Sequence, residues 1–542
     1  MRVDIITTRY KDKSYTAALL RETYREGGKV KHRTLANLSA LPMDVVEMIR
    51  NTLRGETYVP AGKTLRVIRS RSHGAVWAVW QVMRSLGLPE MLGPEGAWRD
   101  RALAMILGRV LCAASKRYTV GWWQGTSVPE WLAGTEEVSV QTLYQAMDKL
   151  LERQPRIEAA LARRHLGAGS LVLYDVTSSY LEGRCCPLAR FGYNRDGKRG
   201  KQQIVLGLLT DGEGCPVAVE VFDGKTRDAA TLPVQLEKLK ARFGIEEVVL
   251  AGDRGMITKL HRDALAEHGY AWITALRAPA VRELKQRGLL QLSLFDQQDL
   301  AEIVDPENPG RRLVMCRNWK VANERCRKRQ DLLAATEAKL AKVARSVAGG
   351  RLKDETKIAL RVGKVLDKFK VGKHFVLSFG PGRFEFRRDE EAIAAEAALD
   401  GIYVVETNVS AERLSAEQVV AGYKSLRHVE RAFRSMKTMQ LELRPIYHRL
   451  ADRVRAHALL CMLAYYVQWH MDKALAPLRE EQPEVYQSFA HVLRRLAEIQ
   501  LNTIQMEKAI FDVATECDAE QRLFLDYLKV RSLVPKKPYT KP

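Results

Sequence analysis

The amino-acid sequence predicts a multidomain α/β protein built around a mixed sheet, and three observations lead to this fold class. The chain has 542 residues, and at roughly 150 residues per domain this length predicts three or four domains. Strand-like segments between residues 170 and 276 alternate with helix-like ones, which is typical of mixed sheets. Hydrophobic residues make up 46% and charged residues 28% of the chain, an ordinary balance for a protein that buries a core.

The charge balance narrows the class of function. Lysine and arginine together number 87 against 65 acidic residues, which gives a net charge of +22. A surplus of this size argues against a typical acidic metabolic enzyme. It favours a polyanionic partner, with nucleic acid ahead of the alternative, a membrane surface.

Three features predict a cytoplasmic protein. The longest apolar run, residues 456–467, is shorter than the roughly 18 residues of a membrane-spanning helix. The N-terminus is charged early, unlike a signal peptide. Eight cysteines without a CxxC pair fit a reducing compartment. The adjacent Cys185 and Cys186 lack the further spaced ligands that a metal site needs.

Changes in residue patterning divide the chain into six expected segments. A turn-like stretch at residues 25–29 predicts a hairpin in the first of them. The last is expected to be mainly helical, with a frayed basic end. The segments are 1–60, small and strand-containing; 61–168, a helical DNA-binding domain; 169–279, the first part of the sheet; 280–398, an insertion; 399–475, the second part of the sheet with a long helix; and 476–542, the helical C-terminal region.

The helical segment contains a basic and aromatic cluster. Apolar spacing predicts helices over 75–88 and 139–151, the second capped by Ser139. The cluster lies between them, and two interpretations stay open: helices that present these cations to DNA, or a packing domain with a solvated basic edge. Its members are Lys116, Arg117, Tyr118, Trp122 and Trp123.

The sheet-forming segment places two acids where strands are expected to end. Three consecutive strands are followed by strand–helix units, and residues at the carboxyl ends of such strands are often functional. Asp175 ends the first strand and Asp253 follows a later one. The expected strands are 171–174, 203–209, 216–222, 248–251, 270–276 and 401–407, and the expected helices are 229–242, 257–268 and 415–438.

A third acid, Glu430, lies on the expected helix 415–438. Mg²⁺ prefers oxygen ligands, and a pair of such ions promotes in-line phosphoryl displacement. Asp175, Asp253 and Glu430 are therefore candidate ligands for this chemistry. The alternative for an aspartate at a strand end is a turn or cap residue.

The neighbours of Glu430 include three cations. Seven residues are close to two helical turns, so Tyr423, Glu430 and Lys437 are expected on one face. Arg427 and Arg434 flank Glu430 on the same side. This stripe is either a helix surface with intrahelical ion pairs or a metal-binding glutamate whose neighbours hold DNA phosphates.

A basic loop precedes the second strand. Residues 192–198 match most of a P-loop, but Arg199 replaces the required Ser or Thr and a strand follows, which excludes nucleotide binding there. Its cations suit phosphate contact beside Asp175, a solvated loop being the alternative. They are Arg184, Arg190, Arg195, Lys198, Arg199 and Lys201. For His448 and His457, phosphate contact and helix packing are equally open.

As a set, these motifs resemble those of the DDE transposases, specifically the insertion-sequence group related to IS4 and especially the IS1634-type family. Residues 214–228 and 444–448 also look familial. One position departs from the family pattern, because Leu426 stands where an arginine is expected, with Arg427 beside it. The motifs are Tyr174-Asp175-Val176-Thr177-Ser178, Ala251-Gly252-Asp253-Arg254-Gly255, and Tyr423, Glu430 and Lys437 at seven-residue spacing.

The resemblance implies an RNase H-like catalytic core interrupted by an insertion domain. It implies that Asp175, Asp253 and Glu430 are the catalytic triad and hold Mg²⁺ or Mn²⁺, two ions per site. Contacts to the DNA backbone near the scissile phosphate are then expected from Tyr423, Arg427 and Lys437. Asp228 is a weaker candidate and fits a loop or cap position better.

The implied function is a prokaryotic transposase, nucleoid-associated when bound to DNA. It would bind the terminal inverted repeats of its element and catalyse strand cleavage and transfer into double-stranded target DNA. A homodimer is expected on the paired ends, because one triad per chain must process two ends. Two alternatives remain open: a metal-dependent nuclease without joining activity, and a DNA-binding protein whose catalytic site has decayed.

Overall fold

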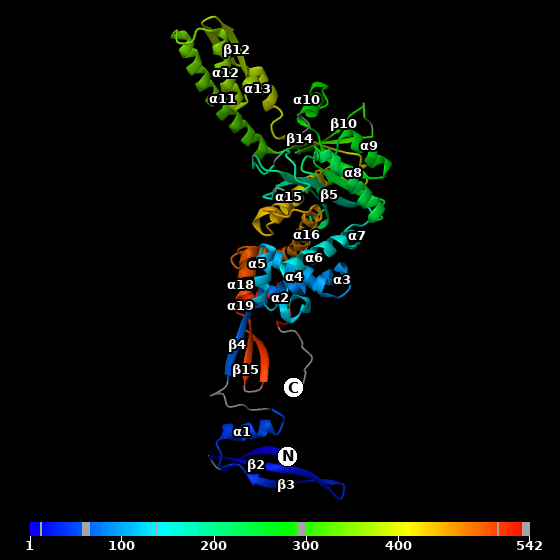
Figure 1. The fold of residues 1–542 in the computed structure, drawn as a ribbon, viewed down its shortest axis with the longest axis vertical. Coiled ribbons are helices and arrows are strands. Elements are labelled where there is room, and N and C mark those ends of the chain that lie inside the picture. The colour runs from blue at the N-terminus through cyan, green and yellow to red at the C-terminus, as the bar shows by residue number, and fades with distance from the viewer. Residues whose placement is uncertain are drawn as a thin grey trace. The chain divides into compact units, whose positions relative to one another are not determined.

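The computed structural model describes residues 1–10, 13–56, 65–136, 138–183, 185–193, 195–198, 200–290, 299–308, 310–506 and 509–533. The chain forms two compact units. The smaller combines Met1–Gly74 with Ala497–Ala519 and Ser532–Pro542, and the larger combines Ala75–Leu496 with Glu520–Arg531. Figure 1 labels the elements of both.

The smaller unit begins with an antiparallel sheet in the order β1-β2-β3. Helix α1 (Met43–Thr52) packs its buried Val46 against Val3 and Ala18 of this sheet. The expected hairpin is present, because β2 and β3 are joined through Gly27 and Gly28, which both have positive φ angles. The strands are β1 (Arg2–Tyr10), β2 (Lys13–Glu26) and β3 (Lys29–Asn37).

A second sheet of this unit joins distant parts of the chain. Its strands β4 (Leu65–Ser72), β15 (Gln500–Met506) and β16 (Ala509–Ala514) pair antiparallel in the order β16-β15-β4. A helical domain was expected over 61–168 and a mainly helical region over 476–542, so the strands of this sheet are an addition to the prediction. The strands are short, and the partners β4 and β15 lie far apart in sequence, so no local pattern indicates their pairing.

The larger unit contains an eight-stranded mixed sheet in the order β10-β11-β14-β9-β8-β5-β6-β7. Strand β8 runs parallel to β5 and β9, and the remaining pairs are antiparallel. The predicted mixed α/β architecture is therefore confirmed. The strands are β5 (Ser170–Tyr180), β6 (Gln203–Asp211), β7 (Pro216–Phe222), β8 (Val248–Gly252), β9 (Ala271–Ala275), β10 (Leu300–Val304), β11 (Arg312–Arg317) and β14 (Ile402–Thr407).

Helices cover this sheet, and β8 is buried at all five of its positions, which explains its continuous apolar sequence. Helix α15 packs on β5 and β6, and α14 packs on β8 and β9. The expected helix over 229–242 is instead a 3₁₀ turn, a short α-helix and a π turn. The helices of this layer are α8 (Leu232–Glu237), α9 (Lys259–Glu267), α10 (Ala278–Gln286), α14 (Ala416–Lys424) and α15 (Leu426–Arg434).

A layer of helices packs against the sheet at the edge formed by β7. The central helix α16 contacts α4, α6 and β7, and it is buried over most of its length. Ser139 caps α6 in a reciprocal capping box with Thr142, which confirms the predicted cap. The helices are α2 (Gly74–Ser85), α3 (Leu88–Leu92), α4 (Ala97–Leu111), α5 (Lys116–Gln124), α6 (Val140–Glu152), α7 (Gln154–His165), α16 (Ala451–Ala474), α17 (Ala476–Glu481), α18 (Phe489–Ala497) and α19 (Ala519–Tyr527).

Among the helices of the described residues, none combines the length and the apolar character that crossing a bilayer requires.

The segment expected as an insertion has two parts. Strands β10 and β11 pair with the central sheet, beside β14. The remainder forms a small α/β substructure whose own core includes Leu340, Ile358 and Phe384. Its elements are α11 (Trp319–Ala348), α12 (Glu355–Phe369), β12 (Phe375–Gly380), β13 (Arg383–Arg388) and α13 (Glu390–Ala397).

Candidate active site

Two of the predicted acids lie side by side on neighbouring parallel strands. Tyr174 of β5 is paired with Gly252 of β8, so the residues that follow them, Asp175 and Asp253, continue the two strands at the same level. Paired positions on adjacent strands lie about 5 Å apart and their side chains project from the same face. Asp253 directly follows β8, as predicted, but Asp175 lies inside β5, which continues to Tyr180. Strand β5 extends further because its second half pairs with β6.

Glu430 is brought to these acids by α15, which packs on β5. The single helix expected over 415–438 is divided at Ser425 into α14 and α15, and it ends in a π-helical turn, η7 (Ser435–Met439). The Ser425 hydroxyl donates a hydrogen bond to the Ala421 carbonyl at 2.9 Å, an interaction that bends helices. Tyr423 therefore belongs to a different helix from Glu430.

The three acids line one pocket, which we call the acid pocket. Its volume is about 360 Å³. Alongside them lie a fourth carboxylate and four cationic side chains, so charges of both signs face one another across the pocket. The charged side chains of its wall are Asp175, Asp228, Asp253, Glu430, Arg195, Arg434, Lys437 and Arg444.

Electrostatic repulsion acts on Asp175, at the base of this pocket. Its pKa is raised to about 7, mainly by burial and also by the charges of Asp253 and Glu430, while the Val176 amide and Arg195 oppose the rise. The Val176 N–H donates to Asp175 Oδ1 at 2.8 Å. A divalent cation between these carboxylates would relieve the repulsion, and hard oxygen donors are the ligands that Mg²⁺ prefers.

The basic loop before β6 is tied to β5 beside the pocket. Arg195 donates to the Val176 carbonyl at 2.6 Å and forms an ion pair with Asp228. Lys198 lies 6.0 Å from the Tyr180 ring, and Lys201 pairs with Glu182 at 2.5 Å. Of these loop cations, Arg195 lines the acid pocket, whereas Lys198 and Lys201 lie outside its wall. Arg199 lies outside the described residues.

The cations of the Glu430 stripe separate into two groups. Arg434 and Lys437 line the acid pocket with Glu430. Arg427 is exposed, lies outside the wall of the pocket and donates to His428 at 3.4 Å. Tyr423 does not line the pocket either. Burial and then the charge of Asp253 raise its pKa to about 12, which indicates that its phenol lies within the electrostatic field of the acids.

The sequence interpretation missed a charged cluster that joins the loop to the end of the Glu430 segment. Asp196 is buried and forms ion pairs with Lys437 at 3.2 Å and Arg444 at 2.7 Å. The Lys437 ammonium also donates to Thr177 Oγ1 at 2.5 Å. Asp228, expected to be a loop or cap residue, lines the acid pocket. No sequence signal marks Asp196, because its partners come from a distant segment.

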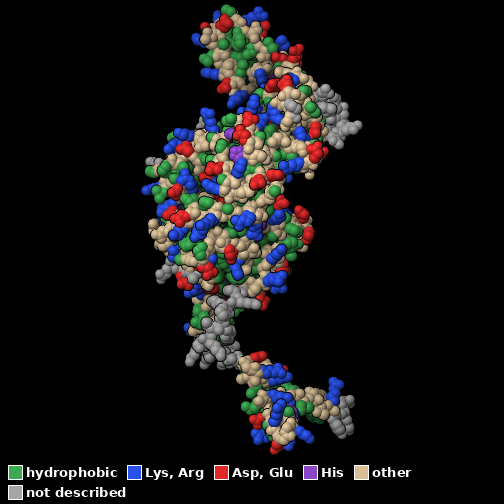
Figure 2. Space-filling model, turned by 90° about the vertical axis from the view of Figure 1, so that its right-hand side faces the viewer, with side chains coloured by type: hydrophobic (Ala, Val, Ile, Leu, Met, Phe, Trp, Pro, Cys, Tyr) green, Lys and Arg blue, Asp and Glu red, His purple; other side chains and the backbone are tan. Residues whose placement is uncertain are grey.

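The predicted basic and aromatic cluster on α5 does not form one surface. Lys116 and Trp123 are buried, whereas Arg117 and Tyr118 are exposed. On the face drawn in Figure 2, lysine and arginine side chains are spread over the described surface with acidic side chains among them. The positive net charge is therefore dispersed on this face.

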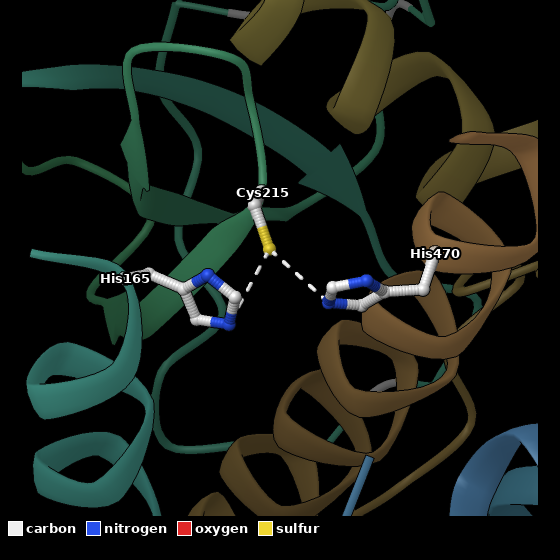
Figure 3. A group of neighbouring side chains, drawn as sticks. All are labelled: His165, Cys215 and His470. Atoms are coloured by element: carbon white, nitrogen blue, oxygen red, sulfur yellow. Dashed lines mark hydrogen bonds between the residues drawn. The ribbon is translucent and has the colours of Figure 1, made fainter. Parts of the chain in front are cut away.

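Another group of possible metal ligands lies outside the acid pocket. His165 of α7, Cys215 before β7 and His470 of α16 converge, as Figure 3 shows, and the Cys215 Sγ lies 3.9 Å from each Nε2. Within the described residues, this is the one group of three ligand atoms within 4.8 Å of one another. By the same measure, the carboxylates of the acid pocket are more widely spaced.

The distances within the group formed by His165, Cys215 and His470 fit hydrogen bonds better than a shared metal ion. A tetrahedral zinc site needs sulfur and nitrogen atoms about 3.6 Å apart, given bonds of about 2.3 and 2.0 Å. The Nε2 of His165 lies only 3.0 Å from the Tyr466 hydroxyl. Because the two Cys–His distances exceed those of a zinc site and His165 already contacts Tyr466, we assign these side chains to packing between α7, β7 and α16.

Two regions of the chain match family models of known proteins. Residues 167–467, more than half of the chain, match the family model described as "Transposase DDE domain". Residues 3–60 match "IS1634 family transposase, N-terminal domain". No curated protein matches the chain.

Among solved structures, the chain is similar to "Cryo-EM structure of piggyBac transposase synaptic complex with hairpin DNA". The two are 11% identical, the match covers 86% of this chain and 83% of that chain, and the TM-score is 0.33. The match to the DDE domain rests on the sequence alone.

Proposed function

The chain belongs to the DDE transposases of the IS1634 type, and from this we propose that it binds the terminal inverted repeats of its insertion sequence and cuts and joins DNA with divalent metal ions. One observation carries the proposal. Asp175, Asp253 and Glu430, from three segments within the matched region, line a single pocket. Cut-and-paste transposition is the pathway that such a site would serve.

The proposal includes an RNase H-like core. In its support, β5 lies between an antiparallel meander and a parallel pair. On one side β6 runs antiparallel to β5 and β7 antiparallel to β6, and on the other side β8 and β9 run parallel to β5. We also assign residues 61–168 to DNA binding, 169–279 and 399–475 to the catalytic core, and 280–398 to the insertion.

The three acids are assigned as the metal ligands. When bound, Mg²⁺ or Mn²⁺ supplies activation of the attacking hydroxyl and stabilisation of the leaving oxygen. Asp175 would hold the metal together with Asp253 and Glu430, because Tyr174 before it pairs with Gly252 before Asp253 and all three acids line one pocket. Their separate supporting elements, two strands and a helix, keep the three carboxylates in place before DNA arrives.

The cations of the pocket are assigned to the DNA backbone. Arg195, Arg434 and Lys437 face the acids, so they are suited to hold the phosphates on either side of the scissile bond. Lys437 is held in position by Thr177 and Asp196. The DNA-backbone contacts outside the acid pocket are assigned to Tyr423, Arg427, Lys198, Arg199 and Lys201. We also propose that a homodimer processes the two paired ends of the element.

The test uses purified full-length protein, labelled DNA carrying the ends of its own element, and Mg²⁺ or Mn²⁺. Asp175→Asn, Asp253→Asn and Glu430→Gln are each expected to abolish cleavage and joining while end binding survives. The matched control is Asp223→Asn, an acid outside the pocket that pairs with Arg190, and it should retain activity.

Three other outcomes would contradict the proposal in part or in whole. Cleavage without joined products would identify a nuclease. Binding without any chemistry in the wild type would identify a decayed, binding-only protein. Activity that survives one of the three substitutions would remove that acid from the site.

A further inference from the structure

A second cavity, of about 490 Å³, lies beside the segment that follows Lys437. Arg444 lines the acid pocket, and the next residue, Pro445, lines this cavity. We call it the cationic cavity, after its wall of basic and aromatic side chains from α4, α5, α6, α16 and the segment that precedes α16. They are Arg109, Lys116, Tyr144, His448, Arg453 and His457.

Lys116 is the most informative of these side chains. It is 6% exposed and lines the cavity. Within the described part of the chain, its ammonium makes no hydrogen bond or ion pair, and the charge that influences it most is that of the cationic Arg109. Lys116 is also the first residue of α5, so its ammonium adds to the positive end of a helix.

Arg109, also 6% exposed, has no acidic partner in the described structure either. Its guanidinium donates to the carbonyls of Ala114, Leu441 and Glu442 at 3.1 to 3.4 Å. These neutral acceptors satisfy its N–H groups but do not neutralise its charge. Two adjacent cations are thus held in the interior without an anion, an arrangement that is costly unless a ligand supplies one.

The remaining wall does not compensate the two cations. Arg453 pairs with Asp148 at 3.5 Å and lies over the Tyr144 ring at 4.5 Å. The Nε2 of His457 donates to the Leu443 carbonyl at 3.1 Å, and burial lowers its pKa, so it is neutral. The one carboxylate of the wall, Glu442, is exposed.

The mouth of the cavity is open to solvent. Tyr447 and Arg449, both exposed, border it, while Arg109 and Lys116 form its buried floor. A phosphate group fits this arrangement, because its oxygens accept several hydrogen bonds and its charge compensates that of the floor. A carboxylate would compensate less charge and accept fewer bonds.

We infer that the cationic cavity is a phosphate-binding site, separate from the acid pocket, that holds a backbone phosphate of the DNA. The assignment to DNA rests on the proposed function and on the adjacency of Arg444 and Pro445, which places the two sites on one segment. A free phosphate or small phosphate ester has the same chemistry, and the experiment distinguishes the two sources.

Both arms are run at pH 6, where the Lys116 ammonium is charged. The first arm measures DNA affinity against salt concentration for the full chain and for Lys116→Met, in Ca²⁺ and without cleavage. Each neutralised phosphate contributes about 0.9 to the slope of log K against log salt. Lys116→Met is expected to reduce the slope by about that amount. Arg117→Met, which removes the same charge one residue further along α5 at an exposed position, should leave the slope unchanged.

The second arm measures thermal unfolding with and without inorganic phosphate. Phosphate should raise the melting temperature of the wild type and of Arg117→Met but not that of Lys116→Met. Without phosphate, Lys116→Met should be at least as stable as the wild type, because it removes an uncompensated buried charge. A merely structural lysine would give the opposite result, a loss of stability.

The outcomes separate the possibilities. A slope change together with phosphate protection supports the inference. Phosphate protection with an unchanged DNA slope assigns the site to a free phosphate and overturns the DNA assignment. No effect in either arm overturns the site itself. Because neither arm involves catalysis, a failure of the inference is distinguishable from a failure of the proposed function.

Discussion

Replacing Asp196 with asparagine should destabilise the larger unit and loosen the basic wall of the acid pocket. The carboxylate is 8% exposed and lies between the ammonium of Lys437, which is 9% exposed, and the guanidinium of Arg444. Removing one member of a buried pair leaves an uncompensated charge and costs about 3 to 5 kcal/mol. Because Arg444 is 18% exposed, we expect the lower end, about 3 kcal/mol.

A double-mutant cycle with Lys437→Met isolates the pairwise contribution. Lys437→Met alone leaves Asp196 paired with Arg444, so its cost should be about 1 kcal/mol, the value of an ordinary hydrogen-bonded contact. In the Asp196→Asn background, the same change also removes an unpaired cation. We therefore expect a coupling energy of about 1 to 2 kcal/mol.

The assay is urea unfolding of the full chain followed by circular dichroism. The control is Asp223→Asn, whose ion pair with Arg190 at 3.5 Å is more exposed and should contribute less than about 1 kcal/mol. An Asp196→Asn protein as stable as this control, or an additive cycle, would refute the reasoning.

Three further predictions follow from other sites. Lys238→Met should lower the free energy of unfolding in urea by about 3 to 5 kcal/mol. In the wild type the Lys238 ammonium lies 3.1 Å from the fully buried carboxylate of Glu158, and the substitution leaves that carboxylate without this cation. A decrease below about 1 kcal/mol would contradict this. Ser139→Ala should cost about 1 kcal/mol through the lost cap of α6, and an unchanged urea midpoint would be the contrary result. Burial and Arg109 lower the pKa of Lys116 to about 7, so its ammonium is charged below that pH and neutral above it. The affinity ratio for DNA between the wild type and Lys116→Met should therefore be larger at pH 6 than at pH 9, and a ratio that rises with pH would contradict the assignment. The other charged or titratable groups at this cavity are Arg109, Tyr144, Glu442, Tyr447, His448, Arg449, Arg453, His457 and Cys461.

The sequence predicted the sheet and its acids because the relevant signals are local. The apolar run of β8 followed by Asp253, and the Ser139 cap before α6, are each contained in a few consecutive residues. The extension of β5 beyond Asp175 was not predictable in this way, since it depends on pairing with β6. The β4–β15 pairing depends on contacts between opposite ends of the chain.

Other features of the site depend on tertiary structure. The division of the Glu430 helix at Ser425 follows from a hydroxyl that bonds back to the helix, and serine alone does not indicate it. Lys116 belongs to a basic stretch that resembles a solvated helix face, but tertiary packing buries it. The clustering of Asp196 with Lys437 joins a loop to a helix end far along the chain, so spacing within one element contains no information about it.

The central claim is that Asp175 holds a metal ion for DNA cleavage, and a change of metal preference tests it most directly. Asp175→Cys replaces a hard oxygen ligand with a softer thiolate, which favours Mn²⁺ over Mg²⁺. We predict that cleavage of element-end DNA by this variant is lost in Mg²⁺ and partly restored in Mn²⁺. Asp228→Cys, in the same pocket but paired with Arg195, should show no such preference. An Asp175→Cys protein that is fully active in Mg²⁺, or equally inactive in both ions, would contradict the assignment.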